Sequence, residues 1–306
     1  MFRKRRLPRG LKSLGPLMAT ALRQQRKSYS NGDHRAGRSN TLVASYNIHK
    51  CVGRDRRFNP WRTMNVIKEI NADVIALQEV DQRFGERLGL LDLHVLEREC
   101  GLTAVPLRAT RNGHGWHGNL VLFRDGVVDR VEQLVLPGAE PRGGLVVDLT
   151  LRAGPVRIIA VHLGLLHRSR TRQVRSILAA SEPPDGRPVV VMGDFNEWRL
   201  GRHSSLQELH PDFGPLDGAV ASFPTRFPVW SLDRIIANPH SLVSLIEVHD
   251  SSLAQIASDH LPIKAALRLG HAVRPERSPS PDVATTGWIE QRSDPAPRRQ
   301  GVKSPP

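Results

Sequence analysis

Short apolar runs recur along residues 41–269, and Gly, Pro, Asn or Asp separates most of them from the next. Runs of this kind are typical of buried β-strands. The pattern predicts strands over 42–48, 72–77, 103–107, 119–124, 127–136, 145–151, 156–161, 189–192, 232–237, 242–248 and 261–269. Apolar residues at helical spacing predict helices over 58–70, 90–100 and 168–180, and one near 204–209. Asn59 and Pro60 supply the N-cap and first position of the earliest helix.

Strands outnumber helices in this pattern, with about ten strands against three or four helices. A doubly wound sheet would alternate the two, so the balance argues against that architecture. The runs between 119 and 161 follow one another with short Gly- or Pro-containing breaks, which is typical of antiparallel pairs. Residues 41–269 are therefore predicted to form one α+β domain of two packed sheets with helices outside.

The two ends of the chain differ from this domain. The formal net charge is +14, of which residues 1–40 carry +10 and residues 270–306 carry +2, leaving +2 for residues 41–269. We predict a basic, disordered N-terminal arm that attracts nucleic acid or an anionic membrane surface. An amphipathic helix on the membrane is the alternative, although Pro16 interrupts its apolar stripe. Seven prolines in residues 270–306 predict a disordered tail.

Cysteine content and hydropathy indicate the cellular compartment of the protein. Cys51 and Cys100 have no CxxC partner, which predicts reduced thiols and no structural metal cluster. No apolar run is long enough for a membrane span. These features predict a cytoplasmic protein, peripheral to a membrane if the arm binds lipid.

The segment after the strand at 189–192 carries the first chemical signal. Gly193 ends the strand, and Asp194 and Asn196 follow on either side of Phe195. In an extended segment, residues two apart project to the same face. A carboxylate that can hold or deprotonate water and an amide that can donate to phosphate would therefore lie together. A plain turn is the alternative for these residues alone.

Similar polar residues occur at other strand ends. Each alone also fits a turn, a cap or a local ion pair. Glu79 gives the strongest indication of a functional site. A carboxylate that closes a buried strand is costly unless it is paired or coordinates a cation such as Mg²⁺ or Mn²⁺. The full set is Asn47, Glu79, His162, Asp194, Asn196, Asp233, Asp259 and His260. Gathered in one cleft, this set suits metal-assisted attack of water on a phosphate ester.

Seven motifs in order carry a resemblance to a known family: SYNIH (45–49), LQEVD (77–81), HGNLVLF (117–123), VHLG (161–164), GDFN (193–196), LDRI (232–235) and SDH (258–260). Over residues 41–269 the chain resembles the endonuclease/exonuclease/phosphatase superfamily, which has the fold of pancreatic-type deoxyribonuclease. The resemblance implies a four-layered α/β/β/α sandwich of two mostly antiparallel sheets flanked by helices. It also implies Mg²⁺- or Mn²⁺-dependent hydrolysis of phosphate esters.

The resemblance also implies roles for individual residues. Glu79 would be the principal metal ligand with Asn47 beside it, and Asp259 would reach the metal. Asp194 would align or deprotonate the attacking water.

Other residues would act on the phosphate or support the site. Asn196 and His162 would bind the scissile phosphate and stabilise its charge. Asp233 would orient a neighbouring imidazole, and Asp259 with His260 would form the last catalytic dyad. The supporting residues would be Asn119, Arg172 and Gln173.

Two differences between this chain and known groups of the superfamily concern the substrate. Abasic-site nucleases of this superfamily carry a tyrosine in the middle of the domain, whereas this chain has only Tyr29 and Tyr46. Residues 223–234 are similar to the inositol polyphosphate phosphatase signature but carry extra spacing. We predict a phosphodiesterase acting on nucleic acid or on a phospholipid head group, the latter as in sphingomyelinase-like members. An inositol-phosphate-type phosphomonoesterase and a non-catalytic binding protein on the same fold are the alternatives.

Overall fold

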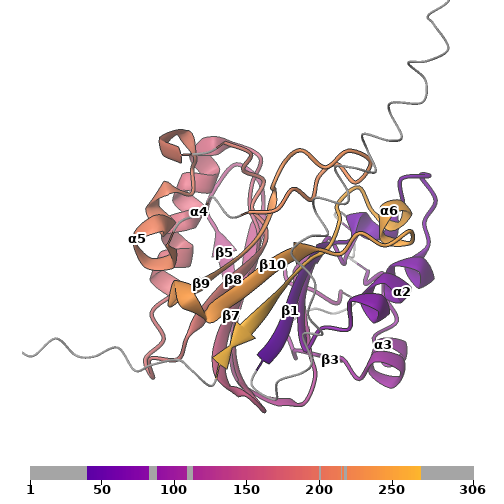
Figure 1. Ribbon diagram of the computed structural model, residues 1–306, viewed down its shortest axis with the longest axis horizontal. Coiled ribbons are helices and arrows are strands. Elements are labelled where there is room, and N and C mark those ends of the chain that lie inside the picture. Colours follow the sequence, from indigo (N-terminus) through magenta and orange to yellow (C-terminus); the bar gives the residue numbers. More distant parts are fainter. Residues whose placement is uncertain are drawn as a thin grey trace, which may run out of the picture. The chain divides into compact units, whose positions relative to one another are not determined.

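The computed structural model describes residues 40–82, 88–108, 113–199, 201–214, 216 and 219–269, which hold eleven strands in two sheets (Figure 1). Residues 1–39 and 270–306 lie outside the described residues, so the basic arm and the proline-rich tail stay predictions. Among the described helices, none has the length and apolar composition that crossing a bilayer requires.

The first sheet has six strands and contains one parallel pair. Its order is β10 (Val243–Val248), β11 (Ile263–Arg268), β1 (Asn40–Asn47), β2 (Val74–Gln78), β4 (Leu120–Phe123) and β3 (Thr103–Ala104). β1 and β2 run parallel, and the other neighbours are antiparallel. β3 is shorter than the predicted strand 103–107, because Pro106 cannot donate to a ladder.

The second sheet has five strands and also contains one parallel pair. Its order is β5 (Gly126–Leu136), β6 (Arg142–Leu151), β7 (Gly154–His162), β8 (Val189–Asp194) and β9 (Asp233–Asn238). Only β7 and β8 run parallel. The two sheets are therefore mostly antiparallel, as predicted.

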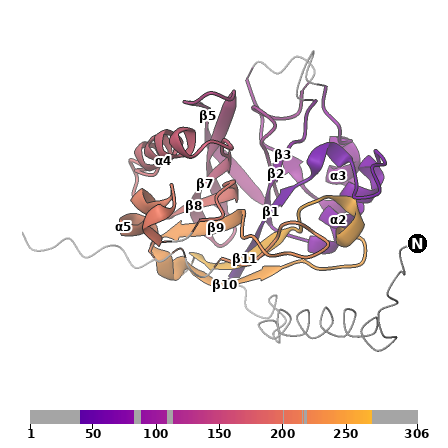
Figure 2. The same ribbon diagram turned by 90° about the horizontal axis from the view of Figure 1, so that it is seen from above.

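Helices cover the outer face of each sheet. α2 (Pro60–Ile70), α3 (Leu93–Cys100) and α6 (Ala254–Ala257) pack with the first sheet, and α4 (His167–Ala180) and α5 (His210–Phe213) pack with the second. A third cluster, with Val43, Leu145 and Met192, fills the space between the sheets. Figure 2 shows the resulting four layers, so the predicted α/β/β/α sandwich is confirmed.

Local signals account for the helix boundaries. The Asn59 side chain accepts a hydrogen bond from the backbone N–H of Arg62, and Pro60 opens α2, as the sequence predicts. The single helix predicted near 204–209 is instead two short 3₁₀ turns, Gly201–His203 and Gln207–Leu209, followed by the one-turn α5. Pro211 in the first turn of α5 cannot continue the hydrogen-bond ladder of a preceding turn.

The parallel pairs determine where the polar strand ends lie. Parallel strands end at the same edge, and the register pairs Asn47 with Gln78 and His162 with Asp194. β9 is antiparallel to β8, so its first residue, Asp233, pairs with Asp194 at that edge. We call this the catalytic edge of the sandwich, because residues predicted from the sequence to be catalytic lie there.

Gly193 sets the path of β8 into this edge. Its φ is +152°, and a Cβ built there would lie 1.9 Å from the carbonyl oxygen of Val161 on β7. Only glycine fits so close an approach of two backbones. The same Val161 pairs on its other side with Gly144 of β6, where a Cβ would make ordinary contacts of 3.6 Å.

We therefore expect Gly193→Ala to lower the free energy of unfolding by about 3 kcal/mol or more, through backbone strain and the clash with β7. Gly144→Ala is the matched control and should change it by less than about 1 kcal/mol. Urea unfolding of both variants makes the comparison, and equal losses would show that the close approach is unimportant.

Candidate active site

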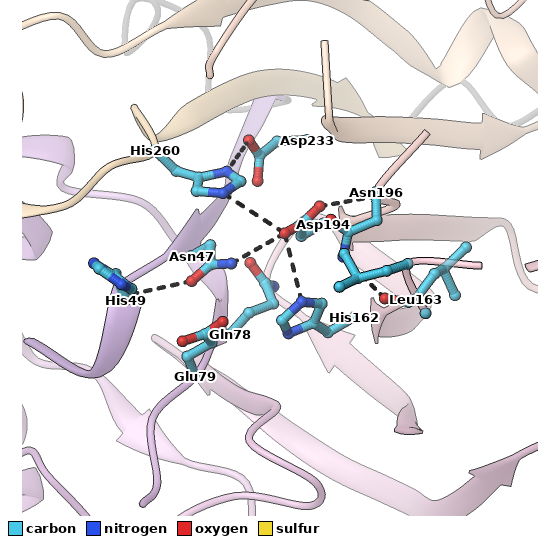
Figure 3. A network of polar contacts seen from close by, with 12 residues as sticks. Asn47, His49, Gln78, Glu79, His162, Leu163, Asp194, Asn196, Asp233 and His260 are labelled. Atoms are coloured by element: carbon cyan, nitrogen blue, oxygen red, sulfur yellow. Dashed lines mark hydrogen bonds and ion pairs between the residues drawn. The ribbon is translucent and has the colours of Figure 1, made fainter. Parts of the chain in front are cut away.

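The Asp194 carboxylate lies at the centre of the catalytic edge, where only 1% of the residue is exposed. Its Oδ2 accepts a hydrogen bond of 3.0 Å from Nδ2 of Asn47 and lies 3.5 Å from Nε2 of His162 (Figure 3). Nε2 of His260 lies 3.8 Å from the same oxygen. The register of β9 also brings Asp233 beside Asp194. One small polar cluster is thus formed by residues from β1, β7, β8 and β9 and from the segment before β11.

His260 forms a buried dyad with Asp233 and not, as the resemblance implies, with Asp259, whose carboxylate lies near His49. Nδ1 of His260 lies 2.8 Å from Oδ2 of Asp233, and the Ser222 hydroxyl donates to that oxygen at 2.5 Å. The Phe223 ring packs 4.7 Å from the imidazole. Burial alone would lower the pKa of His260, but the carboxylates of Asp233 and Asp194 raise it to about 10. The imidazole is therefore a cation and a double donor at neutral pH.

The charge on His260 affects the pKa of the neighbouring Asp194 carboxyl. Burial raises the pKa of the Asp194 carboxyl above its usual range, and the nearby His260 cation opposes that effect. A carboxyl in such surroundings can hold or accept a proton from water close to neutral pH.

Asn196 is fixed beside Asp194 by its backbone. Its φ is +50°, a left-handed conformation that asparagine tolerates. Its N–H donates to Oδ1 of Asp194 at 2.9 Å, and its Nδ2 donates to the carbonyl of Leu163 at 2.9 Å. The amide can therefore present its second N–H proton while the first is held. These bonds join the segment after β8 to the segment after His162.

Oxygen atoms that could bind a hard divalent cation lie on the side of Asn47 that is more open to solvent. The Asn47 Oδ1 accepts from the backbone N–H of His49, and Nδ1 of His49 lies 3.6 Å from the Asp259 carboxylate. Glu79, labelled in Figure 3, directly follows Gln78, which pairs with Asn47 in the register of β1 and β2, and it is ion-paired with Lys50. The Glu79 and Asp259 side chains are 23% and 39% exposed. Two accessible carboxylates and an amide oxygen match the ligands of Mg²⁺ or Mn²⁺.

Asp194, Asp233 and His260 also place one potential ligand atom each within 4.8 Å of one another, all buried. His260 could join this second set as a ligand only in its neutral form, through Nε2, while Nδ1–H stays bonded to Asp233. The raised pKa of the imidazole opposes the loss of that proton. The open set, Glu79 with Asn47 and Asp259, offers ligand types that a hard cation prefers, and its two carboxylates are the more accessible to solvent.

Two of the predicted supporting residues are buried near the site and one is not. Asn119 donates to the carbonyls of Trp116 and Gly143, which ties the segment before β4 to β6. Gln173 accepts a 2.8 Å bond from the N–H of Gly164, just after His162. Arg172 is exposed on α4 and does not reach the site, because the inward face of this helix includes positions 170, 173, 174 and 177.

The buried arginine of α4 is Arg170, which the sequence analysis missed. It is fully buried and donates to Oε2 of Glu197 at 3.1 Å and to the carbonyl of Leu165 at 2.7 Å. Glu197 directly follows Asn196 and also accepts from the N–H and hydroxyl of Ser205. The pair therefore clamps the segments after β7 and β8 onto α4. A charged residue on the same helix face as Val174 and Ile177 is the sequence signal that could have revealed it.

Two serines also support the site without having been predicted. The Ser258 hydroxyl donates to the Asn47 carbonyl at 2.8 Å, which joins the SDH motif to the end of β1. Ser222 holds Asp233 as described above. Tyr46 lies in the cluster between the first sheet and its helices, and Tyr29 lies outside the described residues.

We expect Arg170→Met to lower the free energy of unfolding by about 3–5 kcal/mol, because it removes the shorter, fully buried ion pair of Glu197 and leaves only the 4.0 Å pair with Arg199. Arg175→Met is the matched control on the same helix. It removes an exposed pair with Glu208 at 3.0 Å and should cost at most about 1 kcal/mol. Chemical denaturation of both variants measures the difference, and a small loss for Arg170→Met would argue against the clamp.

Sequence comparison gives two findings for this chain. The profile described as "Endonuclease/Exonuclease/phosphatase family" matches residues 44–260. The protein YbhP of Escherichia coli K12 is 30% identical over 250 residues, which covers 74% of this chain and 96% of YbhP.

Solved structures with a similar fold include three from different sources. An endonuclease/exonuclease/phosphatase from Beutenbergia cavernae superposes with a TM-score of 0.59 at 23% identity, over 76% of this chain and 72% of that one. D. rerio TDP2 in complex with a single-strand DNA product gives 0.54 at 15% identity, over 74% and 98%. A mannosyl-6-phosphatase of Bacteroides thetaiotaomicron gives the same values. At these identities the likeness concerns the fold alone.

Proposed function

The chain belongs to the endonuclease/exonuclease/phosphatase family, whose members hydrolyse phosphate esters, and we propose that it is a divalent-metal-dependent phosphodiesterase. The observation that carries the proposal is the buried Asp194 carboxylate, which faces Asn47, His162 and the His260–Asp233 dyad within one cluster. A desolvated carboxylate among hydrogen-bond donors and a cationic imidazole is what activation of a water beside an anionic phosphate needs.

The role proposed for each side chain follows from its burial and its chemistry. Glu79, Asn47 and Asp259 would hold the divalent cation, which when bound polarises a phosphoryl oxygen and offsets its growing charge. Asp194 accepts a proton from the attacking water or orients it.

Two further side chains act on the phosphate. Asn196 donates its second amide proton to a phosphoryl oxygen, while its bond to Leu163 keeps the amide oriented. His162 lies on the other side of Asp194 and faces the same phosphate. His260, held protonated by Asp233, keeps Asp194 ionised and contributes positive charge.

The charge balance of the site supports a diester over a monoester. A monoester carries nearly two negative charges at neutral pH, whereas a diester carries one. Two described cations near the site are already paired: His260 with Asp233, and Arg170 with Glu197. A single phosphate charge is therefore the better match.

Replacing Asp194 by Asn or His260 by Gln keeps the side-chain shape but removes the carboxylate or the cation. We expect kcat on bis-nitrophenyl phosphate to fall about a hundredfold or more in each variant. His94→Gln, which changes an exposed histidine of α3, should leave kcat unchanged. Retention of most activity in Asp194→Asn would contradict the role given to this carboxylate. Faster turnover of nitrophenyl phosphate than of the diester would favour the monoesterase.

Metal dependence has two readouts. Chelation should abolish turnover and added Mg²⁺ or Mn²⁺ should restore it. Added cation should also raise the midpoint of thermal unfolding, because a ligand that binds only the folded state stabilises it. Glu79→Gln should remove most of that rise, whereas Glu99→Gln, which disrupts an exposed pair with Lys68, should preserve it. An equal rise in both variants would exclude Glu79 as a metal ligand.

A further inference from the structure

Exposed apolar side chains gather at the catalytic edge. Twelve large apolar side chains are exposed among the described residues, and ten of them lie on segments that leave or enter the sheets at this edge. The other two lie on β5 itself: Val135 is near the end of the strand at this edge, and Val127 is at its opposite end. Exposed apolar residues that concentrate beside a site mark an interaction surface.

One group lies beside the phosphate-facing side chains. Leu165 and Leu166 follow His162 and are 56% and 55% exposed. Trp198 follows Asn196 and is 49% exposed. Arg170 connects the two segments, because it donates to the Leu165 carbonyl and its guanidinium lies 5.7 Å from the Trp198 ring.

The other group lies beside the His260 dyad. Phe227, Val229 and Trp230 are 60%, 66% and 48% exposed, on the turn between Phe223 and Trp230. The Trp230 ring stacks on Phe223 at 6.0 Å, and Phe223 in turn packs against His260. Backbone hydrogen bonds from Thr225 to Asp259 and from Leu261 to Ser222 fix this turn to the site. The two groups together, six side chains, are called the apolar rim below.

The composition of the rim favours a lipid surface over nucleic acid. Base stacking uses planar side chains, but half of the rim is aliphatic, and Leu165, Leu166 and Val229 are each more than half exposed. Arginines lie among the apolar residues: Arg168 and Arg226 are exposed, and Arg199 lies 4.9 Å from the Trp198 ring. Exposed Leu, Trp and Phe interleaved with Arg are typical of proteins that lie on anionic membranes.

We propose that the apolar rim docks the catalytic edge on an anionic bilayer, and that the phosphodiester cleaved there belongs to a lipid of that bilayer. This inference rests on the proposed function and specifies its substrate class. In the hydrolysis, water adds to phosphorus, one P–O ester bond breaks and the leaving alcohol takes up a proton, so water is the only co-reactant. The rim residues would position the lipid and take no part in these steps.

The test uses the full chain and vesicles of phosphatidylglycerol. Co-sedimentation is measured in about 1 M NaCl, where a Debye length of about 3 Å suppresses attraction by the basic arm. The wild-type protein should still bind. The double variant Phe227→Ser/Val229→Ser should partition about tenfold or more weakly, because two apolar side chains no longer enter the bilayer.

Val127→Ser, compared with Val229→Ser alone, is the matched control. The two valines are 62% and 66% exposed, but Val127 lies at the end of β5 opposite the catalytic edge. The control variant should bind vesicles as the wild type does. Binding by the rim variants equal to that of Val127→Ser would overturn the proposal, and so would weaker binding of single-stranded DNA with unchanged vesicle binding in the rim variants. Equal thermal midpoints show that the variants are folded.

A separate assay distinguishes failure of this inference from failure of the proposed function. Hydrolysis of bis-nitrophenyl phosphate without vesicles reports the phosphodiesterase alone. Turnover of the soluble diester without rim-dependent vesicle binding overturns only the docking. Rim-dependent vesicle binding without turnover of either the soluble diester or the vesicle lipid overturns the proposed function, and the lipid substrate with it.

Discussion

The desolvation of one carboxylate is the constraint around which the catalytic edge is arranged. Asp194 ends a fully buried strand, and a carboxylate there is stable only if donors or cations surround it. Asn47 and His162 approach it from the ends of other strands, the Asn196 N–H follows it in sequence, and His260 brings positive charge. The interactions that stabilise the charge also create a site that can activate water.

Burial divides this edge into two regions with different chemistry. The His260–Asp233 dyad is nearly inaccessible, which strengthens its electrostatics and keeps the imidazole charged. Glu79 and Asp259 are partly open to solvent, where a hydrated hard cation can reach them without losing all its waters. Asn47 belongs to both regions, because its amide nitrogen contacts Asp194 and its oxygen faces His49.

Much of this could be predicted from the sequence, for identifiable reasons. The apolar runs predicted the strands, and the motifs at their ends predicted that Asn47, His162, Asp194 and His260 would meet. Arg172 was assigned together with Gln173 from the family resemblance, whereas helical geometry turns Arg170 inward. Arg170 contacts Glu197, 27 residues away in sequence, and Ser258 contacts Asn47, 211 residues away. Ser222 contacts Asp233, 11 residues away. Local sequence patterns do not show these pairings, although the apolar face of α4 marks the position of Arg170 as buried.

The most direct test of the central claim is the position of a divalent cation relative to Asp194. Anomalous diffraction at the manganese edge, from crystals of the protein soaked in MnCl₂, locates that ion. The account predicts a peak coordinated by the Glu79 carboxylate and the Asn47 side chain, with Asp194 beside it and the His260–Asp233 contact intact. A peak held between Asp233 and His260, with Glu79 still paired to Lys50, would contradict it.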